Sequence, residues 1–419
     1  SRIHLIKGCW SGEVRLNRNI VPYISPFLSG REEWSLKPLN ENSGQCFLGS
    51  NILGMGFTLT DQEAFELRKK RKINKDVIFP FINGKDLNSS PEQKAGRWVI
   101  NFFDWPEVKS QEYLEPFDLI RQKVKPERQR IKENGKFKIS TKSTREKWWL
   151  YERVRPALYH AVGRGNEFEK HPKTWNYIDK PMKRVLVVAR HSKELIFSLL
   201  ENNMIYSDAT NVIAFESYYI FSILQSSIHS VFVWKFASRL KNDLRYTSTD
   251  VYQPFPKPYL DDSLILDDLE VLGETYHELR ADIMRDKSVG LTELYNRYHN
   301  PEEIDKSIKK MRDLHRQIDE HVALAYGWND IVFEHDFHEV DYLPENDRLR
   351  FTVSETSRNE VIERLTDLNK NRYDAEQKEL GVVKIPRIST KCKITAIDSE
   401  LVKLAESKPQ MDIFGQNDQ

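Results

Sequence analysis

The stretch that decides the fold spans residues 207–250 and reads SDATNVIAFESYYIFSILQSSIHSVFVWKFASRLKNDLRYTSTD. It opens with a short apolar run at 212–215, followed at 218–236 by an aromatic-rich run that indicates a helix. In the last part, at 239–247, Leu240 and Leu244 alternate with polar residues, which indicates a strand that packs one face and presents the other. We therefore expect strand and helix to be combined here, with a charged face directed outward.

The presented face of this strand carries side chains of both charges. Arg and Lys donate hydrogen bonds to guanine and Asp accepts one from the cytosine amino group, so such a face suits the reading of base edges. The candidate base-reading residues are Asp208, Ala209, Arg239, Lys241, Asp243 and Arg245. Residues two apart on a strand point the same way, about 6–7 Å apart. We expect Lys241 and Asp243 to read one base pair, and Arg245 with the turn at 208–209 to read a neighbouring pair. The alternative is a solvated strand edge with surface ion pairs.

Positive charge is concentrated between residues 121 and 155. This segment holds thirteen Lys or Arg against four Glu, a net charge of +9 in a chain whose total is +1. Such a basic stretch with interleaved aromatic residues is typical of contact with nucleic-acid phosphates. The candidate phosphate-binding residues are Lys125, Arg128, Lys136, Lys138, Lys142, Arg145, Lys147 and Arg155. The alternative is a solvated helix with ion pairs along it. Adjacent helical residues point about 100° apart, so we expect only one of Trp148 and Trp149 to be buried.

Composition limits the class of protein. The chain has 419 residues, of which 39% are hydrophobic and 30% charged, so it can bury substantial cores. The three cysteines, Cys9, Cys46 and Cys392, form no CxxC pair, and we assign no metal site and no disulfide framework. No apolar run is long enough for a membrane helix and no signal peptide is evident. We expect a cytoplasmic protein without membrane contact.

The end of the chain has a different pattern from the centre. A proline-rich break at 254–258 is followed by apolar residues at helical spacing, first at 264–284 and then in helices expected at 301–326 and 354–373. The fold class that we expect is α+β, with a mixed α/β region followed by an all-α helical one.

Several blocks, taken in their order along the chain, resemble one family. They are FPFINGKDLN at 79–88, WVINFFDW at 98–105, KPER at 125–128, KWW at 147–149, RPALY at 155–159, LRYTSTD at 244–250, GLTELYN at 290–296 and AYGW at 325–328. These blocks are similar to the target-recognition and C-terminal regions of MmeI-like (Type IIL) single-chain restriction–modification enzymes. The resemblance extends to about residue 376. The same region also occurs in related adenine-specific DNA methyltransferases of phage-defence systems.

The resemblance implies a specificity role. Complete members of the family carry a nuclease and an S-adenosylmethionine-dependent N6-adenine methyltransferase before this region. The sequence contains no Asn-Pro-Pro-Tyr, no Gly-rich loop for the methyl donor and no Asp…Glu-x-Lys nuclease set. We therefore assign no catalytic residue, metal or cofactor to this chain, and expect S-adenosylmethionine and Mg²⁺ in the absent domains. Whether the chain is itself an enzyme is left open.

The expected function is sequence-specific recognition of double-stranded DNA within an adenine methyltransferase or restriction enzyme. The rival is a protein-interaction or structural module with a basic binding face. We expect strands left from a methyltransferase domain, or a linker to it, at 1–19. A target-recognition domain is expected at 20–258, a helical domain at 259–380, and a polar, partly disordered tail at 381–419.

Overall fold

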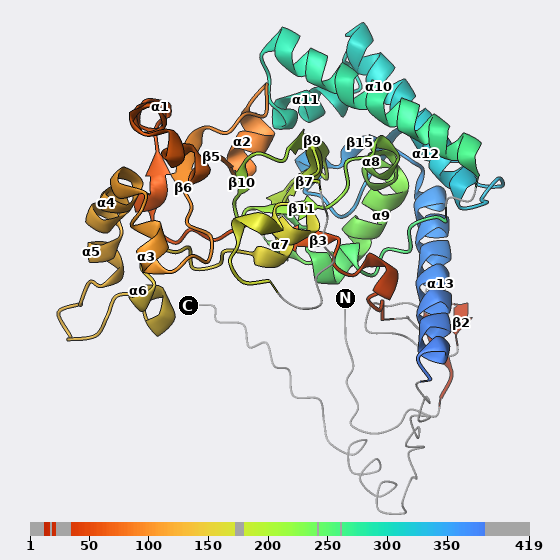
Figure 1. Ribbon diagram of the computed structural model, residues 1–419. Helices are drawn as coiled ribbons and strands as arrows, with labels where there is room; N and C mark the ends of the chain where they lie inside the picture. Colours follow the sequence, from red (N-terminus) through yellow and green to blue (C-terminus); the bar gives the residue numbers. More distant parts are fainter. Residues whose placement is uncertain are drawn as a thin grey trace, which may run out of the picture. The chain divides into compact units, whose positions relative to one another are not determined.

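The computed structural model, drawn in Figure 1, describes residues 12–16, 19–21, 35–171, 180–240, 243–259 and 262–381. The chain divides into two units. One unit comprises Ser1–Ser35 with Gln377–Gln419; its described part contains an antiparallel hairpin of β1 (Val14–Leu16) and β2 (Asn19–Val21). The other unit, Leu36–Glu376, holds the remaining sheets formed by described residues. The tail from 382 on and residues 1–11 lie outside the described residues, and the expected domain boundaries stay predictions.

The first sheet of the larger unit lies in the N-terminal half. Its strand order is β10-β5-β6-β4, with β5 antiparallel to β6 and parallel to β10. The strands are β4 (Thr58–Leu59), β5 (Ile78–Ile82), β6 (Arg97–Ile100) and β10 (Ile205–Tyr206). The helices of this half are α1 (Asp61–Lys70), α2 (Gly84–Ser89), α3 (Glu107–Ser110), α4 (Leu114–Lys123), α5 (Lys125–Arg128), α6 (Lys142–Glu146) and α7 (Pro156–Ala161). Thr60 and Glu63 form a capping box that satisfies free backbone N–H groups at the start of α1.

A second sheet separates two hydrophobic cores. Its order is β3-β11-β7-β9 and all its neighbours are antiparallel. The strands are β3 (Cys46–Leu48), β7 (Arg184–Ala189), β9 (Phe197–Glu201) and β11 (Thr210–Ile213). On β7, Val185 and Val187 belong to the core shared with the first sheet, whereas Leu186 and Val188 belong to the core shared with the helices. Because both faces are buried, the strand is apolar without alternation.

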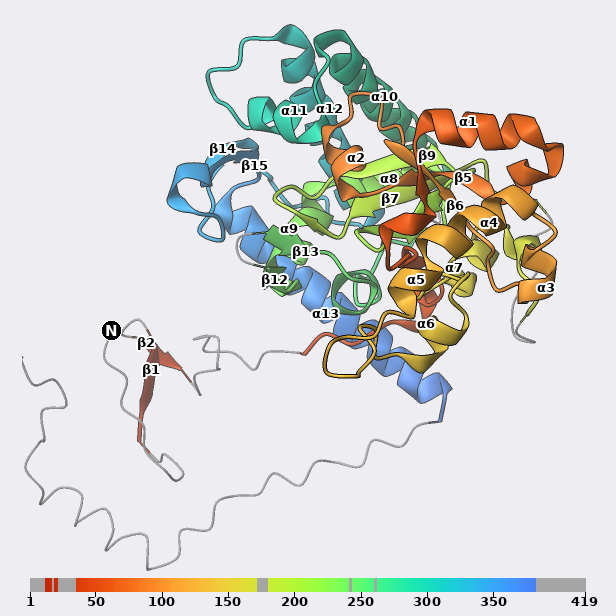
Figure 2. The ribbon, with the colours of Figure 1, turned by 90° about the vertical axis from the view of Figure 1, so that its left-hand side faces the viewer.

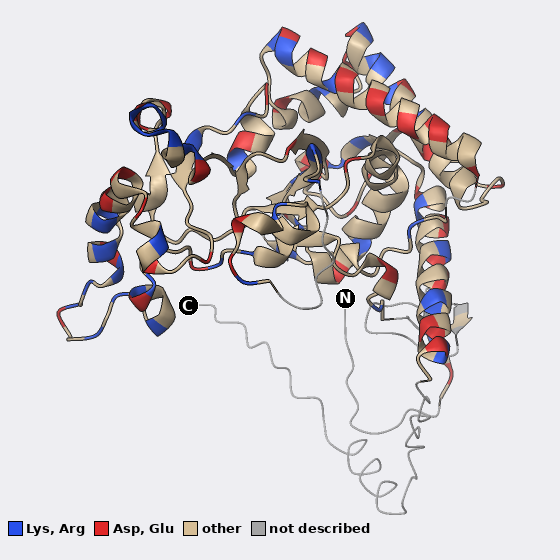
Figure 3. Cartoon of the chain, in the orientation of Figure 1, with Lys and Arg blue, Asp and Glu red and all other residues tan. Residues whose placement is uncertain are grey.

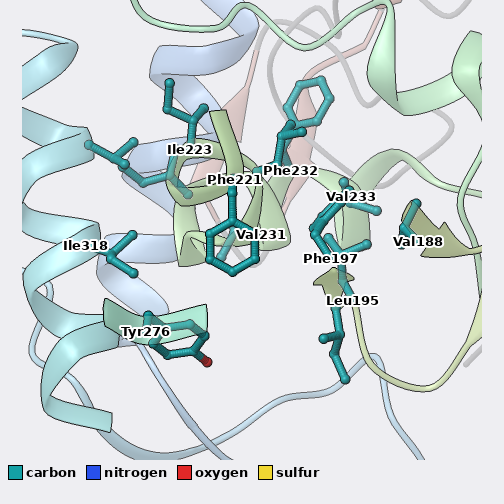
Figure 4. Packing of buried hydrophobic residues seen from close by; sticks show 14 of the residues in the cluster. Val188, Leu195, Phe197, Phe221, Ile223, Val231, Phe232, Val233, Tyr276 and Ile318 are labelled. Atoms are coloured by element: carbon teal, nitrogen blue, oxygen red, sulfur yellow. The ribbon is translucent and has the colours of Figure 1, made fainter. Parts of the chain in front are cut away.

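The C-terminal half consists mainly of helices, the first of which packs on β9 of this second sheet, while two long ones pack on that first helix. The helices are α8 (Tyr218–Gln225), α9 (Ser227–Phe236), α10 (Ser263–Lys287), α11 (Leu291–Tyr298), α12 (Lys306–Ala325) and α13 (Glu355–Glu379), with a hairpin of β14 (Asp336–Glu339) and β15 (Leu349–Thr352). Figure 4 shows Phe221 of α8 between Tyr276 and Ile318 on one side and Phe197 on the other. The expected α+β class and the helix at 218–236 are confirmed, the latter as two helices divided at Ser226. The same core continues across residue 258.

Two local expectations are wrong. Trp148 and Trp149 are both buried, with 2% and 8% of their surfaces exposed. α6 ends at Glu146, so the pair lies in a turn, where adjacent side chains need not diverge as they do on a helix. Trp149 Nε1 donates to the carbonyl of Trp105. The helix expected from 301 begins instead at Lys306, where the Asp305 carboxylate caps the free N–H groups.

Candidate functional site

The polar segment at 239–247 is a hairpin and not one extended strand. β12 (Arg239–Leu240) pairs with β13 (Asp243–Arg245), which pairs in turn with β8 (His191–Ser192). Figure 2 shows this hairpin following α9. Leu244 is 2% exposed, but Leu240 is 56% exposed, so only the first packs as expected. The prediction of one continuous alternating face is wrong because β12 and β13 pair antiparallel to each other. Lys241 lies outside the described residues, and its pairing with Asp243 stays a prediction.

The register of the hairpin separates the expected base-reading residues into two sets. Asp243 and Arg245 are two apart on β13 and share one face, and His191 lies directly opposite Arg245 on that same face. Arg239 lies opposite Leu244 and so belongs to the other face. Its Nη1 donates to the carbonyl of Tyr342 at 3.0 Å, and its guanidinium lies over the Trp234 ring. Arg239 is therefore not brought together with Arg245.

The turn that carries Asp208 and Ala209 lies beside β13. The backbone N–H of Arg190 donates to the carbonyl of Ala209 at 2.8 Å, and the carbonyl of Arg190 accepts from the N–H of Tyr246 at 2.9 Å. The backbone of Arg190 thus joins the turn at 208–209 to Tyr246, the residue that follows β13. Arg245, the last residue of β13, precedes a residue that is joined to this turn through Arg190; that Arg245 and the turn read one base pair stays a prediction.

Gly49 allows the neighbouring strand end to approach the same turn. A Cβ atom at Gly49 would lie 2.1 Å from the carbonyl oxygen of Ser207, so only glycine fits. The N–H of Asp208 then donates to the carbonyl of Ser50 at 3.0 Å. The close approach holds the turn in place against β3.

Arg155 reaches this region from a distant part of the sequence. It has a left-handed backbone, with φ of 54°, and its Nε donates to the carbonyl of Gly49 at 3.1 Å. Burial lowers the pKa of the Arg155 guanidinium; the charges of Arg153 and Arg190 lower it further, whereas Asp208 opposes them. Arg155 is therefore grouped with Asp208 by the fold, and its unfavourable backbone is kept by the surrounding contacts.

Three residues that the sequence reasoning did not select complete this group: Arg153, Arg190 and His191. Burial lowers the pKa of His191, the charges of Arg190 and Arg245 add to the effect and Asp243 opposes it, so the imidazole is neutral at pH 7. The Nε atoms of Arg190 and Arg245 are buried and have no hydrogen-bond partner among the described residues. The sequence did contain a signal for two of them, because Arg190 and His191 directly follow the apolar run of β7 and so lie at the end of a buried strand.

We call this group the mixed-charge cluster. Its members are Arg153, Arg155, Arg190, His191, Asp208, Asp243 and Arg245. The cluster offers cationic donors, carboxylate acceptors and a neutral imidazole that can do either. Such a set can distinguish ligands by the placement of donors and acceptors, which a uniformly basic surface cannot do.

The remaining candidate phosphate-binding residues are spread over α5, α6 and the loop between them. Figure 3 shows many Lys and Arg on α4, α5 and α6. Lys136 and Lys147 are exposed, while Lys138 and Lys142 are exposed and lie near Glu127 and Glu146 at 3.9 Å and 3.5 Å. Lys125 Nζ lies 5.2 Å from the Trp148 ring centre, and Arg145 Nη1 donates to the carbonyls of Ile139 and Ser140.

Arg128 is the exception in this set. Its side chain is 1% exposed, and its guanidinium donates to the carbonyls of Ile52, Leu53, Trp148 and Leu150. An arginine whose fork is used inside the fold does not present it to a phosphate. Arg128 was expected to bind phosphate, and the structure corrects this expectation. The side chain instead holds the segment at 52–53 and the segment at 148–150 together.

The described residues carry neither a metal-ligand cluster nor a membrane-spanning helix. That part of the chain has no group of three or more His, Cys, Asp or Glu placed to hold a metal ion. None of its helices is both long and apolar enough to cross a membrane.

Comparison with known proteins places this geometry in a family context. Residues 161–259 match the family model described as the MmeI target recognition domain. The solved structure of the Type IIL restriction–modification enzyme MmeI in complex with DNA has a similar fold, with a TM-score of 0.55 and 17% identity. This likeness covers 84% of the present chain but only 39% of the MmeI chain.

Other comparisons add little. The type IIG restriction endonuclease BpuSI is 11% identical and matches at a TM-score of 0.30 over 69% of this chain and 32% of its own, which is too low to support an argument. No curated protein sequence matches. The matched segment 161–259 contains five of the seven members of the mixed-charge cluster, all but Arg153 and Arg155, together with strands β12 and β13. The resemblance to the MmeI-like (Type IIL) recognition region, suggested by the sequence blocks, is thereby confirmed.

Proposed function

We propose that this chain recognises a specific sequence of double-stranded DNA. The observation that carries the proposal is the shared face of Asp243 and Arg245 on β13, next to the turn at 208–209 and to Arg155. An Arg can donate to guanine O6 and N7, and an Asp can accept from cytosine N4. Two such side chains about 6–7 Å apart on one strand match the two partners of a base pair or adjacent steps.

The exposed lysines between 121 and 155 would supply affinity without sequence preference. Cations that neutralise phosphates release condensed counterions, and such contacts fix the orientation of a protein on the duplex. Lys136, Lys138, Lys142 and Lys147 are exposed and so available for this role. Arg155 lies apart from them in the mixed-charge cluster, where it could contact a phosphate next to the bases that are read.

The wider activity rests on the resemblance alone. We propose that the chain is the specificity part of an S-adenosylmethionine-dependent N6-adenine methyltransferase or restriction enzyme in the cytoplasm, acting in phage defence. Methyl transfer and cleavage, with S-adenosylmethionine and Mg²⁺, would belong to nuclease and methyltransferase domains outside this chain. The residues here would bind the duplex and orient it.

Base reading is tested by removing each side chain of the pair. In Asp243→Ala and Arg245→Ala, we expect the preference at one base pair to fall by about 5- to 150-fold, because a good contact contributes about 1–3 kcal/mol of discrimination. The measurement is selection of bound duplexes from a random pool. Lys235→Ala, which removes an exposed charge from α9, is the matched control and should select the same sequences as the unchanged protein.

Two outcomes would count against base reading. If both variants select the same sequence with the same ratio, these side chains do not read bases. If the unchanged protein binds no duplex even at low salt, the interaction module with a basic face is the better description.

Phosphate contact is tested by the salt dependence of binding. In the triple variant Lys136→Ala, Lys138→Ala and Lys142→Ala, affinity should fall about equally for all duplexes. The slope of log K against log salt should become shallower by roughly one unit per lost contact. A matched triple on α12 (Lys306→Ala, Lys309→Ala and Lys310→Ala) removes the same charge from another exposed surface and should leave the slope unchanged. Equal slopes in the two triples would refute phosphate contact at 136–142.

A further inference from the structure

The side chain of Glu194 is 15% exposed and joins the end of β8, the neighbour of β13, to residues 299 and 350 of the C-terminal half. It follows β8 by two residues, and β8 is the strand that pairs with β13. Glu194 Oε1 lies 3.1 Å from Nη1 of Arg350 on β15, and Oε2 lies 3.3 Å from Nε2 of His299, directly after α11. Burial would raise the pKa of this carboxyl, but His299, Arg350 and Lys193 outweigh burial and lower it, so Glu194 is ionised at neutral pH.

The tautomer of His299 is set by its second contact. His299 Nδ1 accepts a hydrogen bond from the N–H of Phe351 at 3.2 Å. A neutral His299 then carries its proton on Nε2, which is the atom that faces Glu194. The imidazole thus holds Glu194 against β15 without needing to be charged.

Further contacts hold both outer strands of the three-stranded sheet. Next to Glu194, Lys193 Nζ lies 2.6 Å from the carboxylate of Asp347, just before β15. At the opposite edge, Arg239 of β12 donates to the carbonyl of Tyr342, whose ring stacks on Trp234 with centres 4.6 Å apart. β13, which carries Asp243 and Arg245, is the middle strand. We call β13 the recognition strand. Its two neighbours are therefore both held by contacts with residues 342–350.

The three strands have few internal restraints. They are two, three and two residues long, and an isolated assembly of such short strands is not stable in water. Base discrimination requires side chains held within about 0.5 Å of their productive positions. Contacts outside these strands must therefore hold their side chains in place. The ionic contacts of Glu194 are largely shielded from solvent, so loss of one partner leaves a charge that nothing compensates.

We infer that Glu194 is a positioning residue for base reading, through which the C-terminal half fixes the register and angle of the recognition strand. This inference rests on the proposed DNA recognition and deepens it. Glu194 itself touches no base in this account; it acts through β8 on Arg245 and its neighbour His191.

The test compares discrimination with general affinity. In Glu194→Gln, we expect the ratio of affinities for the selected duplex and a single-mismatch duplex to fall about tenfold or more. Affinity for random duplex and its salt slope should stay the same. Both are measured below the melting temperature of each variant. Glu194→Asp, which keeps the charge, should restore part of the ratio.

A matched control separates positioning from loss of stability. Glu303→Gln removes the Glu303 partner of Arg297, 2.7 Å away, in the same half of the chain but apart from the hairpin. It should leave the discrimination ratio unchanged. Equal loss in Glu303→Gln and Glu194→Gln would overturn the inference. Should Glu194→Gln not fold, Lys193→Ala breaks the less buried contact and should give a smaller fall; an unchanged ratio there would overturn the inference as well.

Failure of the inference differs from failure of the proposed function. If the unchanged protein shows no sequence preference, DNA recognition itself is wrong. If it shows a preference that Glu194→Gln retains in full, recognition stands and Glu194 is only a structural residue.

Discussion

Replacing Arg128 by Ala is expected to lower the free energy of unfolding by about 3–4 kcal/mol. The guanidinium donates to four backbone carbonyls, and a buried acceptor left without a donor costs about 1–3 kcal/mol before relaxation or water entry. Burial lowers the pKa of Arg128 to about 10, so the group remains charged at neutral pH. One of its acceptors is Leu53, which has an unfavourable left-handed backbone with φ of 40° that this contact helps to hold.

Urea denaturation measures the change in the free energy of unfolding. Two further variants show whether that change is specific to the guanidinium of Arg128. Arg128→Lys should lose nearly as much stability, because a lysine cannot reproduce the planar fork of donors. Arg130→Ala removes an exposed arginine from the same segment and should change stability by no more than about 0.5 kcal/mol. If Arg128→Ala were fully stable but showed a shallower salt slope for duplex binding, the residue would be a phosphate contact after all.

Lowering the pH from 7 to 5 is expected to destabilise the fold by about 2 kcal/mol for each of two buried histidines, His229 and His277. Burial lowers the pKa of both imidazoles to about 3. The Nε2 atom of His277 accepts from the N–H of Leu199 at 3.3 Å, and protonation would remove that acceptor. His229 Nδ1 bonds to the carbonyl of Leu224, which leaves Nε2 unprotonated in the neutral ring.

The sign follows from proton binding in the two states. Between pH 6.5 and 3 the unfolded chain binds protons at these histidines and the folded chain does not, so stability falls as the pH is lowered through this range. His277→Gln keeps an acceptor near the position of Nε2 and should remove about half of the loss between pH 7 and pH 5. His338→Gln, at a surface histidine, should leave the loss as it was. Equal stability of the unchanged protein at pH 7 and pH 5 would show that the buried imidazoles take up protons without cost.

The sequence by itself determined those secondary-structure elements whose buried face gives a local apolar pattern. The aromatic-rich run at 218–236 predicted helix, which is present as α8 and α9, and the helical spacing at 264–284 predicted α10, because burial of one face imposes a periodicity that can be read locally. The resemblance to the recognition region was found for a different reason. Each short block alone is common, but the order of the blocks along the chain is not.

Only the tertiary structure decided which charged residues act together. A sequence lists Arg128 and Lys136 alike as cations, but one is enclosed by carbonyls of distant loops and the other faces solvent. Likewise, the antiparallel pairing of β12 with β13 places Arg239 and Arg245 on opposite faces, although a continuous strand would have aligned them. Arg155, Arg190 and Asp208 meet through contacts between segments that are far apart in the chain. Charge carries no periodicity that reveals its partners, so their grouping depends on long-range packing that local patterns do not encode.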